Sequence, residues 1–204
     1  MSNKVLEQFG YLDIYVFDQL LKGNISPESK ILDAGCGNGR NHFFFVKEGY
    51  DVSAFDLNTE SLENAKSQAK ELNYPKLHQF KQGDMTDIPF KSNSFDFIIN
   101  VAVLHFANNR AHFEKMLTEL VRVCTPGGKI LMRVASNIGI KHLFVAINEN
   151  AQRYLMPDGS ERFVMNEEDF EYFTSKVKCD FAEPIKTTNV NNLRCMTTWL
   201  IRKL

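Results

Sequence analysis

Short apolar segments alternate with amphipathic helices over residues 29–135, and this alternation restricts the fold more than any other feature of the chain. The predicted strands are 29–33, 51–56, 77–81, 95–101 and 129–134. Strands that alternate with helices form a mostly parallel sheet, with right-handed crossovers and helices on both faces. The chain is therefore predicted to be an α/β protein whose ligands bind beyond the carboxyl ends of the strands.

The segments outside this core are predicted from their own patterns. Apolar residues at helical spacing from Val5 to Leu20 predict one amphipathic helix over residues 4–22. Residues 138–154 are expected to be helical, and the sequence at 156–160 is typical of a turn.

The C-terminal part begins with a helix signal. Asn166 precedes three acidic residues, a pattern that predicts the N-terminus of a helix. Two late strands, at 177–183 and 193–202, are expected to complete the sheet.

Composition excludes several classes of protein. The chain has 204 residues, 44% of them hydrophobic, and its 24 basic and 25 acidic residues give a net charge of −1. Such a chain can bury one self-sufficient core, and without a basic excess no nucleic-acid partner is expected. No apolar run has the roughly 18 residues of a membrane span, and residues 1–15 lack a signal peptide's apolar stretch. A cytoplasmic monomer or homodimer is therefore expected.

The cysteines and histidines show no metal-binding arrangement. Cys36, Cys124, Cys179 and Cys195 are far apart and form no Cys-x-x-Cys pair, which argues against a zinc ribbon or a thioredoxin-like motif. The histidines are equally scattered. No metal site is predicted, and the cysteines are expected to be buried free thiols.

Three aspartates stand where successive parallel strands are predicted to end. Asp33, Asp56 and Asp84 are separated by 23 and 28 residues, about one strand–helix unit each. Because the carboxyl ends of parallel strands meet at one edge of a sheet, the three carboxylates are expected to converge on one crevice. Gly35 and Gly37 follow the first of these strands, and glycine lets the backbone approach a ligand closely.

The main alternative for this loop is the Gly-x-Gly-x-x-Gly motif of dinucleotide-binding proteins. Counted from Gly35, the third glycine should be residue 40, which is Arg40, and Gly39 comes one position early. The charge of Asp33 would also oppose a pyrophosphate and attract an ammonium group. An NAD(P)-dependent oxidoreductase stays open as the alternative function.

Five segments in order resemble the motifs of class I S-adenosylmethionine-dependent methyltransferases. They are ILDAGCGNGR, FDLN, QGDMTDIPF, FDFIINVAVLHFA and LVRVCTPGGKILM, which together span roughly residues 30–135. GNGRN and EGYDVSAFD are further similar to the methyltransferase type 11 and tellurite-resistance-like branch. The resemblance implies a Rossmann-like, doubly wound, mostly parallel seven-stranded sheet with an antiparallel last strand. It also implies S-adenosylmethionine as the cofactor and S-adenosylhomocysteine as its product.

The same resemblance suggests how the chain is divided. One methyltransferase domain is expected over residues 1–204, made of four consecutive parts. These are an N-terminal helical lid (1–28), a cofactor-binding core (29–135), a substrate-side insertion (136–165) and a C-terminal helix with strands (166–204).

The resemblance also implies which residues bind the cofactor. The expected cofactor residues are Asp33, Gly35, Gly37, Arg40, Asp56, Leu57, Asp84, Met85, Asn100 and Val101. Asp56 would accept hydrogen bonds from both ribose hydroxyls, since a carboxylate has two oxygens, and Leu57 would pack against the adenine. Asp84 would accept from the exocyclic amine, with the Met85 amide facing a ring nitrogen. Arg40 would either reach the cofactor's carboxylate or form a surface ion pair.

Methyl transfer is an in-line displacement at a carbon that the sulfonium charge already activates. Alignment of the two reactants is then the main task of the protein, and a base is needed only if the acceptor is protonated. His105 is the candidate catalytic base, with a packed histidine as the alternative.

Candidate substrate residues come from the lid and from the fifth strand. Tyr11 and Tyr15 belong to the lid, and Arg133 either faces the pocket or pairs with an acid of the late helices. Residues 100–103 lack the Asn-Pro-Pro-Tyr motif that the resemblance would lead one to expect in adenine or glutamine methyltransferases, so a small-molecule acceptor is expected. A non-catalytic domain that senses S-adenosylmethionine is a third hypothesis, because cofactor residues alone do not prove turnover.

Overall fold

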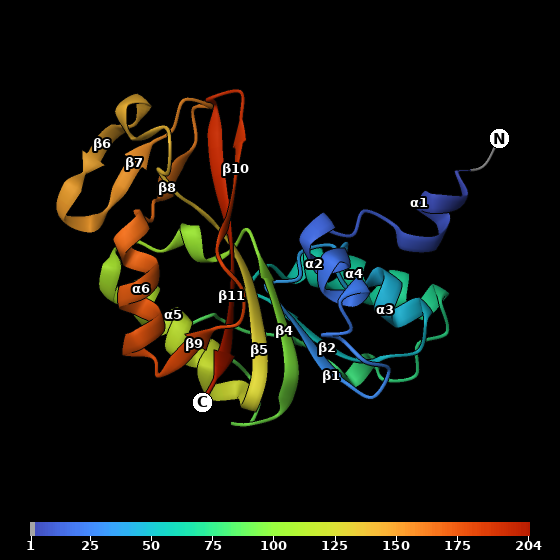
Figure 1. Cartoon of the computed structure of the whole chain (residues 1–204). Coiled ribbons are helices and arrows are strands. Elements are labelled where there is room, and N and C mark those ends of the chain that lie inside the picture. Colours follow the sequence, from blue (N-terminus) through green and yellow to red (C-terminus); the bar gives the residue numbers. More distant parts are fainter. Residues whose placement is uncertain (1–2) are drawn as a thin grey trace.

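The computed structural model describes residues 3–204, and a mixed β-sheet forms its centre (Figure 1). The strands of this sheet are β1 (Lys30–Ala34), β2 (Asp51–Asp56), β3 (Phe80–Gln82), β4 (Phe95–Val101), β5 (Cys124–Ala135), β9 (Cys179–Phe181), β10 (Lys186–Val190) and β11 (Arg194–Lys203). They run in the order β10-β11-β5-β4-β1-β2-β3, and β9 also pairs with β11. β1 to β5 are parallel to one another, whereas β11 is antiparallel to all its neighbours. The predicted parallel sheet with an antiparallel last strand is confirmed, with three late strands in place of the two expected.

Helices cover both faces of the sheet (Figure 1). The α-helices are α1 (Lys4–Phe9), α2 (Ile14–Leu21), α3 (Phe43–Lys47), α4 (Thr59–Glu71), α5 (Arg110–Val123) and α6 (Glu167–Lys176). α2, α3 and α4 lie on one face, and α5 and α6 lie on the other. The side chain of Asn166 caps α6 as predicted, in a capping box with Asp169. Among residues 3–204, no helix is long and apolar enough to cross a membrane.

Alternate residues of the central strands point to opposite faces and fill two cores. In β1, Ile31 belongs to the core under α2, α3 and α4, and Leu32 belongs to the core under α5 and α6. Phe97 and Ile98 of β4 divide in the same way, and all four side chains are fully buried. Burial of each such side chain stabilises the fold by about 1.5–3 kcal/mol. The strand ends that carry the site are therefore fixed from both sides.

The prediction of a single N-terminal helix over residues 4–22 is wrong. The chain forms α1 and α2 instead, because the backbone turns at Gly10, where φ is +61°. Asp13 then starts α2 by accepting a hydrogen bond from the N–H of Tyr15 at 3.0 Å. Apolar spacing continues across the break, although the helical backbone does not.

The prediction of a helix at residues 138–154 is also wrong. This segment contains η3 (Lys141–Leu143), β6 (Val145–Asn148), η4 (Glu149–Ala151) and β7 (Arg153–Leu155), and β8 (Glu161–Phe163) follows. The three strands form a small antiparallel sheet in which Val145 pairs with Leu155. Short apolar runs fit either a helix or a strand, and here the pairing decides. The predicted turn at 156–160 is confirmed, since it joins β7 to β8.

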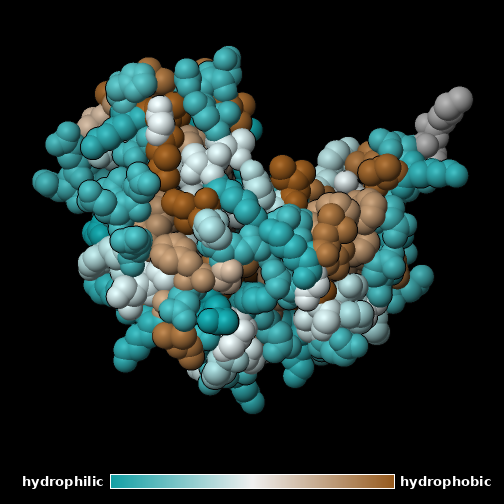
Figure 2. All heavy atoms as spheres, viewed as in Figure 1, coloured by the Kyte–Doolittle hydropathy of each residue, from teal (hydrophilic) through white to brown (hydrophobic). Residues whose placement is uncertain are grey.

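The molecule is hollowed between the small sheet β6-β7-β8 and the region of α1 and α2, and apolar side chains gather along this hollow (Figure 2). In the same view β11 ends at the bottom, beside the C-terminus (Figure 1). The parallel strands run opposite to β11, so their carboxyl ends lie at the top, on the side of the hollow.

Candidate functional site

One large cavity lies at the carboxyl ends of the parallel strands. Its volume is about 980 Å³, at the upper end of the range of about 300–1,000 Å³ typical of small-molecule sites. Segments that follow β1, β2, β3 and β4 form its walls, together with part of α5. Eight of the expected cofactor residues and one expected substrate residue line it: Gly35, Gly37, Arg40, Asp56, Leu57, Asp84, Met85, Val101 and Tyr11.

The loop after β1 presents bare backbone to the cavity. Gly35 has a φ of +75°, and a Cβ at this position would lie 2.6 Å from Cγ2 of Val103, so only glycine fits here. At Gly37, no atom outside residues 36–38 lies within 4 Å of the place that a Cβ would take. A ligand can therefore approach the main chain of Gly37 closely.

Two backbone amides hold the carboxylate of Asp56 at the end of β2. The N–H of Gly37 donates to Oδ2 at 2.7 Å, and the N–H of Asn58 donates to Oδ1 at 2.8 Å. Each carboxylate oxygen can accept a further hydrogen bond, and Asp56 is only half-buried. Asp56 thus ties the β1 loop to β2 and still offers acceptor capacity to the cavity.

Asp84 follows β3 and is held in its ionised form. Its Oδ1 accepts hydrogen bonds from the backbone N–H and the hydroxyl of Thr86, both at 2.7 Å. These two bonds hold the pKa of the Asp84 carboxyl below its usual value, against a smaller opposing effect of burial. An ionised carboxylate only accepts hydrogen bonds, so Asp84 suits a ligand N–H group.

Asp33 and Asn100 lie behind the cavity wall instead of in it. The side chain of Asp33 is 1% exposed, and its Oδ2 lies 2.8 Å from Nδ1 of His42. Asn100 is fully buried and donates from Nδ2 to the carbonyl of Ala34 at 2.9 Å. The side chains of Asp33 and Asn100 thus support the loop after β1, and the roles predicted for Asp33 and for the carbonyl of Asn100 at the methionine end of the cofactor stay predictions.

His105, the candidate base, does not belong to the cavity lining. It lies in the 3-10 turn η2 (Leu104–Phe106) and is buried. Burial lowers the pKa of His105 to about 4, and the positive charge of Arg162 acts in the same direction. Such an imidazole is uncharged at neutral pH and is a weak base. Position and pKa both favour the packed histidine.

Arg133 and Tyr15 also lie outside the cavity lining. The guanidinium of Arg133 pairs with the carboxylate of Asp13 and lies 4.9 Å over the ring of Tyr15. The hydroxyl of Tyr15 lies 2.8 Å from Oγ1 of Thr188 in β10. The partner of Arg133 is therefore an acid of the N-terminal segment and not of the late helices. These contacts hold the start of α2 against the sheet.

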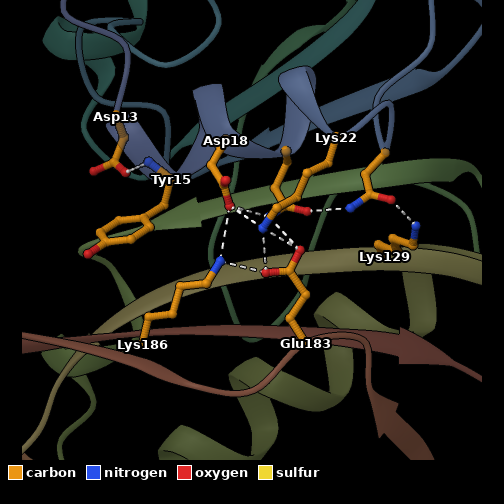
Figure 3. Close-up of polar contacts among 9 residues, drawn as sticks. Asp13, Tyr15, Asp18, Lys22, Lys129, Glu183 and Lys186 are labelled. Carbon is orange, nitrogen blue, oxygen red and sulfur yellow. Dashed lines mark hydrogen bonds and ion pairs between the residues drawn. The ribbon is translucent and has the colours of Figure 1, made fainter.

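A second group of contacts holds the other end of α2 (Figure 3). Lys22, directly after α2, lies 2.7 Å from Asp18 of that helix and 3.0 Å from Glu183, and Lys186 of β10 bridges the two carboxylates. The hydrogen bond from Lys22 lowers the pKa of the Asp18 carboxyl. α2 is thus fixed at both ends to the β10 side of the sheet.

The cavity wall also contains residues that the sequence analysis did not single out as ligand contacts. His112, in the first turn of α5, is half-buried, and its Nδ1 accepts a hydrogen bond from the N–H of Asn108 at 3.1 Å. Phe106 and Ala102 line the wall after β4, and Ala102 has a φ of +64°. Uncommon backbone conformations of this kind cluster at functional sites. The only sequence signal for His112 was its place at the start of the helix after the fourth strand.

Comparison with known proteins agrees with this geometry. Residues 32–132 match a family described as a methyltransferase domain. The chain belongs to the class I S-adenosylmethionine-dependent methyltransferases. In residues 3–204 of this methyltransferase, no three His, Cys, Asp or Glu side chains are grouped so that they could hold a metal ion.

Relatives of this methyltransferase match mainly its core. It is 33% identical over 120 residues to malonyl-[acyl-carrier protein] O-methyltransferase of Erwinia billingiae. The match covers 57% of this chain and 43% of that protein. The chain spans about half the length of the curated relatives it matches.

Solved structures match nearly the whole methyltransferase chain. An S-adenosylmethionine-dependent methyltransferase of Methanosarcina mazei has a TM-score of 0.73 at 19% identity, over 91% of this chain and 97% of that one. Magnesium protoporphyrin IX methyltransferase of Synechocystis was solved with bound S-adenosylhomocysteine. Its TM-score is 0.70 at 16% identity, and the match covers 100% of this chain and 89% of that one. These likenesses support the fold.

Proposed function

We propose that this protein transfers a methyl group from S-adenosylmethionine to a small molecule. One observation carries the proposal: the polar groups on the cavity follow the order of the strands. Asp84 follows β3, Asp56 is the last residue of β2, and the exposed backbone of Gly35 and Gly37 follows β1. S-adenosylmethionine presents an amine, a diol and an amino-acid part in the same linear order.

Each of these groups has a task that suits its surroundings. Asp56 would accept hydrogen bonds from the two ribose hydroxyls, because each of its oxygens has acceptor capacity left. Asp84, kept ionised by Thr86, would accept from the adenine amine. Leu57 is 65% exposed, so its side chain is free to cover the adenine ring. Arg40 is exposed and lies 4.0 Å from Asp13, which suits the ion-pair alternative, and it would pair with the carboxylate of the methionine part when the cofactor is bound.

The chain's own contribution to the reaction is alignment. When bound, S-adenosylmethionine supplies a methyl carbon that the sulfonium charge activates. The walls after β1 and β4 would hold this carbon in line with the acceptor, and orientation of this kind lowers a barrier by about 7–11 kcal/mol. His105 lies behind the wall, so we assign it no proton transfer.

The cavity's size and borders support a small acceptor. The volume of about 980 Å³ leaves room for a second molecule beside the cofactor. Tyr11 lines the cavity from the break between α1 and α2, which supports a lid function for residues 1–28. Residues 136–165 would border the same hollow as a substrate-side insertion. The magnesium protoporphyrin IX methyltransferase that shares this fold is named for a small-molecule acceptor.

Thermal unfolding with added ligands tests the cofactor assignment. S-adenosylhomocysteine at 100 times its dissociation constant stabilises a protein by about 2.7 kcal/mol, which raises the Tm of a chain this size by roughly 5–10 °C. The same concentration of NAD should leave the Tm unchanged. A rise with NAD and none with S-adenosylhomocysteine would contradict the proposal and favour an oxidoreductase.

A further inference from the structure

The part of the cavity beside β4 differs from the part beside β1, β2 and β3. The groups assigned to the cofactor follow β3, β2 and β1 in the sheet order, so the space after β4 is left for the methyl acceptor. Ala102, Val103 and Phe106 follow β4 in the chain and line this space, which we call the acceptor end. None of these three side chains carries a charge.

The charged side chains near the acceptor end already have partners or cofactor tasks. Arg133 is paired with Asp13 outside the cavity lining. Arg162 lies 4.8 Å over the ring of Phe106 and is also outside the lining. Arg40 lines the cavity but is assigned to the cofactor's carboxylate. Within residues 3–204, the acceptor end therefore offers no cation to an anionic substituent.

The same space offers no general base. His105 lies behind the wall, and burial lowers its pKa to about 4. His112 lines the cavity, but its Nδ1 lone pair accepts the N–H of Asn108, which leaves Nε2 as a donor. An acceptor that must lose a proton to a side chain, such as an alcohol, finds no group here to take it.

We propose that the acceptor is an apolar thiol that reacts as its thiolate and carries no other charge. This inference deepens the proposed function and rests on it. The thiolate sulfur forms a bond to the methyl carbon while the bond from that carbon to the sulfonium sulfur breaks. The electron pair of the broken bond stays on the cofactor sulfur, so both products are neutral thioethers and no proton moves. The positive charge that attracts the thiolate is supplied by the sulfonium, because the wall of the acceptor end is uncharged.

Two matched aryl thiols test the inference. 4-Methylbenzenethiol and 4-mercaptobenzoate both form thiolates near neutral pH, and they differ in a methyl or a carboxylate opposite the sulfur. With S-adenosylmethionine present, kcat/KM for the methyl compound is expected to exceed that for the carboxylate by at least tenfold. Its pH dependence should follow the ionisation of the thiol alone, with no further group titrating between about pH 6 and 8.

A pair of lysine substitutions locates the effect. Phe106 is 54% exposed and Leu57 is 65% exposed, so both positions tolerate a lysine without loss of the fold. Phe106→Lys puts a cation at the acceptor end and is expected to reduce the preference for 4-methylbenzenethiol at least threefold. Leu57→Lys, at the cofactor end, should leave the ratio of the two thiols unchanged and weaken S-adenosylhomocysteine binding instead.

Calorimetric titration with S-adenosylhomocysteine separates the two ways in which this experiment can fail. If the wild type binds S-adenosylhomocysteine but methylates neither thiol, or methylates 4-mercaptobenzoate as fast as its partner, the inference is overturned and the proposed function stands. If the wild type does not bind S-adenosylhomocysteine, the proposed function itself fails.

Discussion

Asp33 and His42 form a buried polar pair beneath the glycine-rich loop. Their side chains are 1% and 3% exposed, and Oδ2 of Asp33 lies 2.8 Å from Nδ1 of His42. Loss of one partner leaves the other buried without a hydrogen bond, which costs about 3 kcal/mol. His42→Ala is expected to lower the free energy of unfolding in urea by that amount, and the exposed His142→Ala by less than about 0.5 kcal/mol. Equal effects of the two substitutions would contradict this role.

His105 makes the folded protein sensitive to mild acid. Burial lowers the pKa of His105 to about 4 in the folded chain, whereas a histidine in an unfolded chain titrates near pH 6.5. As the pH falls between these values, the unfolded state binds a proton that the folded state does not, so folding loses stability. This residue alone should lower the free energy of unfolding by about 1.4 kcal/mol per pH unit below pH 6.5, levelling off near pH 4.

His105→Gln removes the titrating group and should flatten this decline. The loss of unfolding free energy between pH 7 and pH 5 is expected to be smaller than in the wild type by about 2 kcal/mol. His78 is exposed, so His78→Gln serves as the matched control and should keep the wild-type slope. If the unfolding free energy of His105→Gln falls with pH as steeply as that of the wild type, the imidazole of His105 titrates in the folded chain as it does in the unfolded one.

At the scale of elements, the two ends of α2 are held by ion pairs that differ in burial. Asp13 and Arg133 at its start have side chains 3% and 16% exposed, whereas Asp18 and Lys186 at its other end are 34% and 35% exposed. An exposed ion pair contributes less than about 1 kcal/mol to the free energy of unfolding. Removing one partner of a buried pair costs more, because the other charge stays buried without a partner. The start of α2 is therefore the anchor that also places Tyr11 on the cavity.

Hydrogen exchange measures this anchor directly. Arg133→Met is expected to lower the free energy of unfolding by about 3 kcal/mol and to speed amide exchange in α1 and α2. Lys186→Met should change the free energy of unfolding by less than about 1 kcal/mol and leave exchange in the two helices near the wild-type rate. Unchanged protection of α2 in Arg133→Met would show that the apolar face of the helix holds it alone.

The elements that the sequence predicted correctly are those whose signals are local. The apolar run of β4 and the cap at Asn166 lie within a few consecutive residues and appear where they were expected. The small sheet was not predicted because its apolar residues fit the helical period as well as the strand period. The pairing of Val145 with Leu155 that decides between them is a tertiary contact, which no local pattern shows. The break between α1 and α2 also had a local signal, since Gly10 and the helix-capping Asp13 lie between the two helices, but the apolar spacing continues across them.

The same distinction applies to the site. Asp56 and Asp84 were predicted to line the cavity because a strand end places them there, and they do line it. Asp33 follows the same rule, but its contact with His42 turns it beneath the wall. The pairing of Arg133 with an acid 120 residues away depends on how α2 docks on the sheet, which no local pattern encodes.

At the scale of the whole molecule, different parts of the chain form the two ends of the cavity. Residues 35–85 supply the groups assigned to the cofactor, residues 102–106 form the acceptor end, and Tyr11 lines the cavity from the N-terminal segment. The hollow that leads there is bordered by the small sheet and by α1 and α2 (Figure 2). The family match covers residues 32–132 and leaves out both borders. Connecting segments vary more among relatives than the elements they join, so this is where acceptor specificity is expected to differ.

The central claim is that Asp56 holds S-adenosylmethionine in this cavity, and calorimetric titration with S-adenosylhomocysteine tests it most directly. The wild type is expected to bind in the micromolar range, about −8 kcal/mol. Asp56→Asn keeps the shape of the side chain but loses an acceptor oxygen, so its affinity should be at least tenfold weaker, about 1.4 kcal/mol. Asp180→Asn, at a side chain 51% exposed, should bind as the wild type does. Equal affinity in Asp56→Asn, or no binding by the wild type, would contradict the account.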